Sequence, residues 1–316
     1  MPEFHKPRSG SLGSWPRKRV SRTYPSVTTY PETGECKPVL FAGYKAGMTQ
    51  VMMKDTRQNS PTKNQFISVP VTIIDTPPLF IIGARSYRKT EDGLELVEEV
   101  GAPEEKIPKD IREKVSFAGK DNLEEEADLV RLIVSTQPKR SGVGKKEPEV
   151  FELPLGGSFE EQKDYIEEKL GEDITVEDVF EEGEFSDAVA ITKGKGYQGT
   201  TKRYGTKIKT RKDEERRHVG SLGARGDGRV RFSVPQPGQD GFHRRTDEKK
   251  RVLKFGEGEE VNPSGGFSNY GLVKENYLMV KGSVPGPKKR LVMVRKSVKD
   301  GKKIPIEIKE IKTSGQ

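Results

Sequence analysis

The chain has 316 residues, of which 31% are hydrophobic and 34% are charged, and its formal net charge is +8. This length permits two or three domains, but so few apolar residues predict a buried core that is small for the size. One cysteine, Cys36, excludes an internal disulfide, and three scattered histidines offer no ligand set for a structural zinc. The sequence has no apolar run long enough for a membrane span or a secretory signal, so we expect a cytoplasmic protein that does not contact membranes.

The charges are unevenly distributed along the chain. Residues 91–187 contain 30 Asp and Glu against 12 Lys and Arg, so the rest of the sequence carries a net +26. This asymmetry predicts a basic binding protein with one acidic insertion.

Residues 1–38 are rich in Pro, Gly, Ser and basic residues and have no helical or strand period, which predicts an extended basic N-terminal arm. A floppy tail would have the same composition, and Trp15 is the residue that favours docking on a partner. Residues 39–89 carry the runs VLFAGYKAGMTQVMM and FISVPVTIIDTPPLFIIGARSYR, separated by turn residues. Such runs are typical of β-strands, and we predict that they form the first part of a β-barrel.

Residues 90–187 are predicted to form an acidic α/β insertion. Within it, DLVRLIVSTQP has a strand pattern and SFEEQKDYIEEKLG a helix pattern, with Ser158 and Glu161 as a capping box. Ile166 lies on the apolar face of this helix, and Gly171 stands where a C-terminal cap belongs. We expect the helix carboxylates to be a solvated face rather than an acid–base site.

Strand-like runs return after the insertion. They are AVAITK within residues 188–194, and NYGLVKENYLMVKGSV and RLVMVRK within residues 257–300, followed by a C-terminal tail at 301–316. A sheet that begins early in the chain is therefore predicted to be completed by strands far along it.

Residues 195–256, between these strands, are predicted to be a long basic loop. The stretch 192–254 contains 19 Lys and Arg, 10 Gly and seven carboxylates, with almost no aliphatic run. Because so few apolar residues cannot offset the conformational entropy of folding, we expect a polyanionic partner to order this segment. Glycines that permit close approach and aromatic rings that can stack, such as Tyr197 and Tyr204, favour nucleic acid as that partner.

An enzyme is not supported by any motif in the sequence. GKGYQG at 194–199 matches the dinucleotide fingerprint, but the cationic, glycine-broken sequence after it lacks the helix that a Rossmann unit requires. The sequence offers no P-loop and no Ser/His/Asp, Cys/His or paired-carboxylate set, so we predict no catalytic residues, no metal site and no cofactor. The turn KGSVPGPKKR at 281–290 is different, because Lys288, Lys289 and Arg290 are expected to point outward together toward a phosphate backbone.

Five motifs carry a close resemblance to the ribosomal protein L3 family, in the order and spacing of its archaeal and eukaryotic branch. They are PRSGSLG near the start, FAGYKAGMT at 41–49, TKGKGYQG at 192–199, VPQPGQDGFHRRT at 234–246 and VKGSVPGPKKRLV at 280–292. The resemblance covers nearly the whole chain and is weakest in the acidic insertion.

The resemblance implies a mixed, β-rich fold with an α/β insertion: a closed six-stranded β-barrel of the translation-protein type, an extended N-terminal arm and a long central loop. It implies a non-enzymatic structural constituent of the large ribosomal subunit that binds and folds large-subunit rRNA early in assembly, with the loop reaching toward the peptidyl-transferase centre. The implied partners are that rRNA and neighbouring large-subunit proteins, with the protein a monomer within the cytoplasmic ribosome. Mg²⁺ is implied only as part of the surrounding rRNA.

The predicted rRNA-binding residues are cationic, aromatic, His and Gln side chains of the arm, the loop and the basic turn. They are Lys6, Arg8, Trp15, Arg17, Lys18, Arg19, Arg22, Lys193, Lys195, Tyr197, Lys202, Arg203, Tyr204, Lys207, Lys209, Arg211, Lys212, Arg216, Arg217, His218, Arg225, Arg229, Arg231, Gln236, Gln239, His243, Arg244, Arg245, Lys281, Lys288, Lys289 and Arg290.

Arg225 is a departure from the family pattern, in which the loop tip commonly carries Trp, or Gln in bacterial members. A guanidinium can stack on a base and also pair with phosphate, so we expect binding at the tip with a changed contact. The alternative function is a free nucleic-acid-binding regulator, which would share the charge but would need a self-folding reader module that the sequence does not contain.

Overall fold

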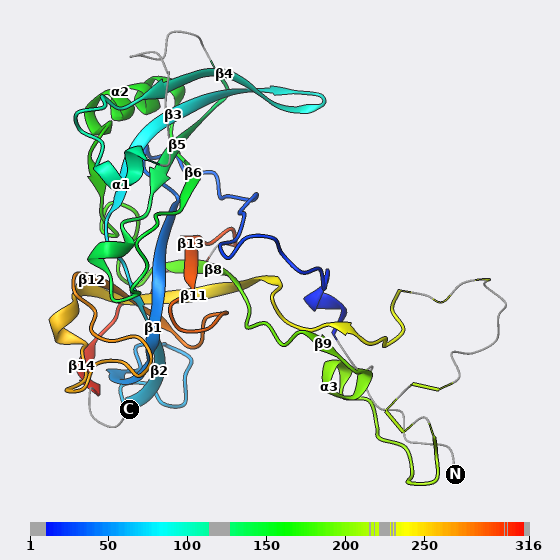
Figure 1. Ribbon diagram of the computed structural model, residues 1–316. Coiled ribbons are helices and arrows are strands. Elements are labelled where there is room, and N and C mark those ends of the chain that lie inside the picture. The colour runs from blue at the N-terminus through cyan, green and yellow to red at the C-terminus, as the bar shows by residue number, and fades with distance from the viewer. Residues whose placement is uncertain are drawn as a thin grey trace. The chain divides into compact units, whose positions relative to one another are not determined.

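The computed structural model describes residues 11–113, 127–214, 216–217, 219–220, 228, 230, 232–299, 301 and 303–312, and is drawn in Figure 1. It is rich in β-strands and has few helices. The chain divides into two compact units: a small unit of residues 1–23 and 191–245, and a large unit of residues 24–190 and 246–316. The described residues include no helix with the length and apolarity that a bilayer span requires.

Most elements belong to the large unit, and β11 begins at the end of the small unit. The strands are β1 (Leu40–Lys54), β2 (Phe66–Asp75), β3 (Leu79–Thr90), β4 (Gly93–Gly101), β5 (Leu129–Ser135), β6 (Val150–Pro154), β7 (Asp173–Ile174), β8 (Phe185–Ile191), β9 (Tyr197–Gln198), β10 (Gly238–Gln239), β11 (Arg244–Glu257), β12 (Asn276–Lys281), β13 (Leu291–Lys296) and β14 (Ile308–Lys312). The helices are α1 (Lys109–Arg112), α2 (Phe159–Lys169) and α3 (Thr200–Tyr204), with short 3₁₀ turns at Leu12–Ser14, Pro138–Arg140 and Gly258–Glu260.

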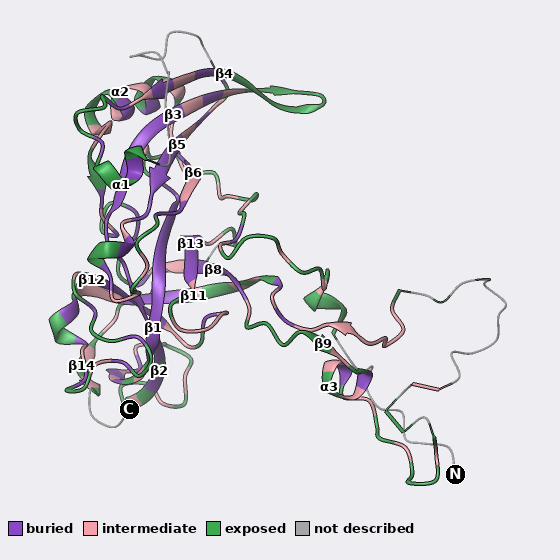
Figure 2. Cartoon of the chain, viewed as in Figure 1, coloured by how far each residue is buried: buried purple, intermediate pink, exposed green. Residues whose placement is uncertain are grey.

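A seven-stranded sheet dominates the large unit, with the strand order β13-β8-β11-β12-β2-β1-β14. Strand β13 also pairs with β1, from Leu40 opposite Arg295 to Tyr44 opposite Leu291, so six strands follow one another in a cycle of pairings. Apolar residues such as Val71, Ile73 and Leu278 are completely buried along these strands. Figure 2 shows much of β1 in purple, the colour of buried residues. Burial of this β-branched and aliphatic surface is the main stabilising term for the sheet.

The insertion forms a second sheet, with the order β4-β3-β5-β6 and with β7 paired to β3. Helix α2 begins with the predicted capping box, in which Ser158 and Glu161 each bond the backbone of the other. Ile166 of α2 is buried in the same core as the strand residues, and Gly171 follows the helix with φ +81°. The predicted strand at β5 and the predicted helix, with both caps, are therefore confirmed.

The structure differs from the predicted strand set in two strands, β3 and β11. The sequence pattern assigns the run that becomes β3 to the first part of the barrel, but β3 pairs with β4, β5 and β7 in the insertion sheet. The sequence of β11 is predicted to be loop up to residue 256, but it forms a strand of 14 residues that pairs with β12. Its first half, RRTDEKKR, is too polar to show a strand period, and burial begins at Arg251, Val252 and Leu253.

Two smaller differences concern the start of β12 and the C-terminal tail. Residues 269–275 precede β12 as turn and bridge rather than strand, and part of the predicted C-terminal tail forms β14, an edge strand against β1. The predicted boundaries of the arm, insertion and loop remain predictions.

Candidate nucleic-acid interface

The positive charge of the protein is concentrated in the small unit. Its residues include 21 Lys and Arg against 6 Asp and Glu, a net +15, which leaves the large unit with a net −7. A unit with this excess of cations is suited to a polyanion, because each neutralised phosphate releases condensed counterions.

The two sides of the central loop leave the sheet as a narrow antiparallel ribbon. Backbone hydrogen bonds join Lys195 N to Asp240 O and Asp240 N to Gly196 O, both at 2.9 Å, and β9 pairs with β10 just beyond. Thr192 and Phe242 extend the pairing to the outer ends of both segments, with Thr192 N donating to His243 O at 3.0 Å and Phe242 N to Lys193 O at 3.2 Å. The ribbon fixes the base of the loop without an apolar core.

Glycine is required at one position of this ribbon. Gly241 has φ +73°, and a Cβ there would lie 1.9 Å from the carbonyl oxygen of Lys193. Any side chain would therefore separate the two sides of the loop base.

Arg203, on the short helix α3, ties that helix to the returning side of the loop. Its Nε donates to Gln239 O at 3.0 Å and its Nη1 to Gln236 O at 2.7 Å. Helix α3 then ends at Gly205, which takes φ +69°. The guanidinium fork thus holds two backbone carbonyls at once through two separate nitrogen atoms in a fixed plane, a geometry that a lysine does not have.

The N-terminal arm lies against the same loop base. Arg245 donates through Nη1 to Pro16 O at 3.1 Å and through Nη2 to Ser14 O. Val20 N donates to Phe242 O at 3.2 Å, and His243 Nδ1 is 2.9 Å from Lys18 O. Backbone groups of the arm and side chains of the loop therefore satisfy one another.

Aromatic rings and guanidinium groups complete this contact. The Arg17 guanidinium carbon lies 4.1 Å from the ring centroid of Tyr204, whose side chain is largely buried. Trp15 meets Phe232 edge-to-face, with centroids 5.4 Å apart. Cation–π and edge-to-face pairs of this kind add stabilisation beyond their buried area.

His243 is buried, with 5% of its surface exposed. Burial lowers its pKa below the ordinary value, and the charges of Arg245 and Arg203 lower it further. These effects favour the neutral imidazole. Within the described residues its Nε2 has no hydrogen-bond partner.

Most of the predicted rRNA-binding residues of the small unit fall into two groups. Six of them serve the internal contacts just described: Trp15, Arg17, Arg203, Tyr204, His243 and Arg245. The exposed group is Lys18, Arg19, Arg22, Lys193, Lys195, Tyr197, Lys202, Lys207, Arg211, Lys212, Arg216, Arg217 and Arg244. The sequence could not reveal the internal roles, since the acceptors are mostly backbone carbonyls.

The remaining predicted residues of the small unit are half-buried or lie outside the described residues. Lys209, Gln236 and Gln239 are half-buried, and Gln239 Nε2 donates to Gly241 O at 3.0 Å. Lys6, Arg8, His218, Arg225, Arg229 and Arg231 are outside the described residues.

The basic turn of the large unit departs from its prediction. Its three adjacent cations do not all point outward, because only Lys289 is exposed. Lys288 Nζ donates to Ser268 O at 2.6 Å, and burial lowers the pKa of Arg290. The turn folds back onto the protein, so Lys289 is the member of this triplet that is most open to a ligand.

The described residues contain no group of three or more His, Cys, Asp and Glu side chains that could hold a metal ion. The prediction that the protein uses no metal or cofactor stays a prediction.

Comparisons with known proteins agree with the motifs. The family model described as ribosomal protein L3 matches residues 1–313. The chain is similar to the large ribosomal subunit protein uL3 of Methanothermobacter thermautotrophicus, with 46% identity across 95% of this chain and 94% of the relative. It is 47% identical to uL3 of Methanopyrus kandleri, across 97% of this chain and 89% of the relative, and 43% identical to uL3 of Archaeoglobus fulgidus, across 95% and 94%. The chain belongs to the ribosomal protein L3 family.

Proposed function

We propose that this protein is a structural, non-enzymatic constituent of the large ribosomal subunit that binds large-subunit rRNA through its small unit. The observation that carries the proposal is the separation of roles within that unit. Arginines and aromatic rings build the loop base and hold the arm, while thirteen predicted contact residues remain exposed around them. A basic scaffold with so little apolar core needs an RNA surface to complete its folding.

In this proposal the exposed residues bind rRNA in two ways. Lysines and arginines such as Lys202, Lys207 and Arg211 neutralise phosphates, while the exposed ring of Tyr197 stacks on an unpaired base. Binding folds the rRNA early in assembly, because phosphates can pack closely only after their charge is neutralised. The loop then reaches toward the peptidyl-transferase centre.

We also propose how the sheet closes and where the protein acts. Six strands close into a barrel of the translation-protein type, which the additional pairing of β13 with β1 supports. The protein acts as a monomer in the cytoplasm beside neighbouring large-subunit proteins, and it needs no cofactor of its own beyond the Mg²⁺ held by the rRNA.

Sedimentation of a cell extract on a sucrose gradient tests the proposal, with the protein detected in each fraction at low salt and after a high-salt wash. Co-migration with large subunits in both conditions is the expected result. A free pool near the monomer mass of 35.3 kDa, or a pool bound to chromosomal DNA, would instead support a free regulator.

Salt dependence gives a second test with purified components. If roughly ten phosphates are engaged, the logarithm of the rRNA affinity should fall against the logarithm of salt concentration with a slope of about −7 to −9. An affinity that does not change with salt would contradict binding by phosphate neutralisation.

A further inference from the structure

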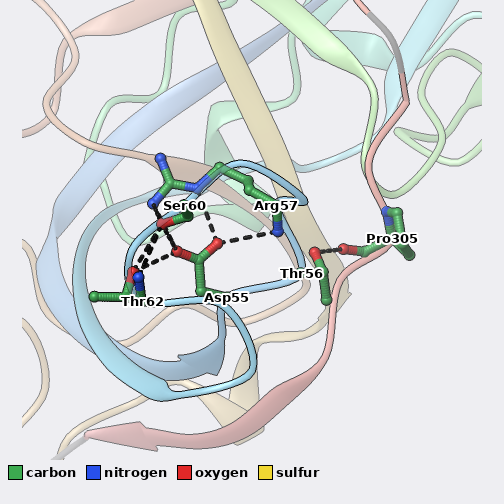
Figure 3. A network of polar contacts seen from close by, with 6 residues as sticks. All are labelled: Asp55, Thr56, Arg57, Ser60, Thr62 and Pro305. Atoms are coloured by element: carbon green, nitrogen blue, oxygen red, sulfur yellow. Dashed lines mark hydrogen bonds and ion pairs between the residues drawn. The ribbon is translucent and has the colours of Figure 1, made fainter.

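Three cations of the large unit lie close enough to repel one another electrostatically. They are Arg57 in the loop after β1, Arg251 in β11 and Lys281 at the end of β12. Hydrogen bonds place Thr56, the chain neighbour of Arg57, beside Arg251, because Thr56 Oγ1 and Arg251 Nη2 donate to the same Pro305 carbonyl, at 2.8 and 2.9 Å. Figure 3 shows the Thr56 bond beside Arg57. The pairing of Val252 with Val280 brings Arg251 and Lys281 side by side across β11 and β12.

Asp55 is the carboxylate of this cluster, and its acceptor positions are already used. Its Oδ1 accepts from Arg57 N and Nε, and its Oδ2 accepts from Arg57 Nη2 at 2.8 Å and from Ser60 Oγ and Thr62 Oγ1 at 2.6 Å. These bonds, the one to Arg57 above all, hold the pKa of Asp55 well below its ordinary value. Asp55 therefore balances the charge of Arg57 and fixes its position.

The other two cations have no carboxylate bonded to them among the described residues. Arg251 is 5% exposed and holds the carbonyls of Ile304 and Pro305 with Nη2, while its buried Nε has no hydrogen-bond partner in the described part of the chain. Lys281 is half-buried, and its ammonium has no hydrogen bond or ion pair with another described residue. Burial lowers the pKa of Lys281, and the charges of Arg57 and Arg251 lower it further.

We propose that Arg57, Arg251 and Lys281 form a binding site for one backbone phosphate of RNA. A phosphate would supply the acceptor oxygens that Lys281 lacks and would offset two positive charges that the protein leaves uncompensated. Arg57 can contribute its outer edge, since Asp55 occupies its Nε and Nη2. Charge-assisted bonds to phosphate are strong, and a guanidinium that is fixed in advance loses little freedom on binding.

Inorganic phosphate is the probe for the first test. The full chain is acetylated on its lysines in phosphate or in chloride at equal ionic strength, and labelling is read by mass spectrometry. Phosphate should slow acetylation of Lys281 by about threefold or more and leave Lys63, an exposed lysine of the loop after β1, unchanged. Arg57→Gln should remove most of this protection. Equal rates for Lys281 in phosphate and chloride would overturn the site.

Binding to large-subunit rRNA is the second test, and here the inference rests on the proposed function. Lys281→Gln should weaken binding by about three- to tenfold near 0.1 M salt and reduce the salt slope by about 0.7–0.9, as expected for one lost phosphate contact. Lys63→Gln is the matched control and should change neither value. If both variants bind like the wild type, the site is wrong while the proposed function stands. If the wild type itself does not bind rRNA, the proposed function fails, and phosphate protection still decides the site.

Discussion

Arg203→Lys separates the shape of Arg203 from its charge. The arginine holds Gln236 O and Gln239 O through two nitrogen atoms in a fixed plane, and a lysine keeps the positive charge but replaces that fork with a single nitrogen. Hydrogen bonds from charged donors contribute roughly 1.5–3 kcal/mol each when buried, and Arg203 is half-buried, so we expect closure of the loop base to weaken by about 2 kcal/mol in total.

Hydrogen exchange measures this loss directly. The Asp240 amide donates to Gly196 O across the ribbon, and its exchange rate reports how often the loop base opens. A loss of about 2 kcal/mol corresponds to roughly 30-fold faster exchange, since each 1.4 kcal/mol is a factor of ten. Exchange followed by mass spectrometry on peptides covering 192–199 and 236–243 gives the comparison.

Lys202→Gln is the matched control, because Lys202 is an exposed cation on the same helix α3. It should leave exchange at the loop base unchanged and lower the rRNA affinity at moderate salt, whereas Arg203→Lys should accelerate exchange. Unchanged exchange in Arg203→Lys, or equal acceleration in both variants, would refute a positioning role for Arg203.

Three further outcomes follow from buried or constrained groups. Burial raises the pKa of Asp75 from the ordinary 3.8 to about 6. The free energy of unfolding should therefore fall by up to about 3 kcal/mol as pH rises from 4 to 6. Asp75→Asn should flatten this dependence when unfolding is measured by urea titration at each pH. Arg295 forms a buried ion pair with Asp187 at 3.1 Å, and Arg295→Met should cost roughly 3–5 kcal/mol in the same unfolding assay; a loss below about 1 kcal/mol would contradict the role of the pair. Gly241→Ala should lower rRNA affinity at least about tenfold by opening the loop base, while Gly199→Ala, where a Cβ meets nothing within 4 Å, should bind normally in the same measurement.

The differences at β3 and β11 show what the local sequence can and cannot predict. The run of β3 and the runs of β1 and β2 have the same apolar character, so nothing local says that β3 pairs with β5 of the insertion instead. Partner choice is settled by tertiary contacts, such as the pairing of the buried Ile81 with Val134 and of the buried Ala84 with Leu132. β11 fails for a different reason. Its sequence is mostly cationic, and the buried apolar pair Val252 and Leu253 is too short to indicate a strand of 14 residues.

The candidate site is predictable from the sequence in its charge but not in its geometry. The excess of Lys and Arg in the arm and loop is enough to indicate a polyanionic partner, because charge is a property of composition. The roles of Arg203 and Arg245 are not predictable, since both bind carbonyl oxygens that every residue possesses. The proximity of Arg57 and Arg251 is not predictable for a related reason: they are far apart in the sequence, and the Pro305 carbonyl that brings them near is bonded by Arg251 and by Thr56, the neighbour of Arg57.

The pairing that completes the six-strand cycle also sets the order in which the chain can fold during synthesis. Leu40 of β1 pairs with Arg295 of β13, 255 positions later, whereas the insertion sheet pairs strands that lie between residues 79 and 174. At 5–20 residues per second, the ribosome needs roughly 13–50 s to deliver β13 after β1 has been made. During that interval the apolar edge of β1 has no strand at the position of β13 and can pair with other nascent chains, so the new protein should depend on chaperones at this stage.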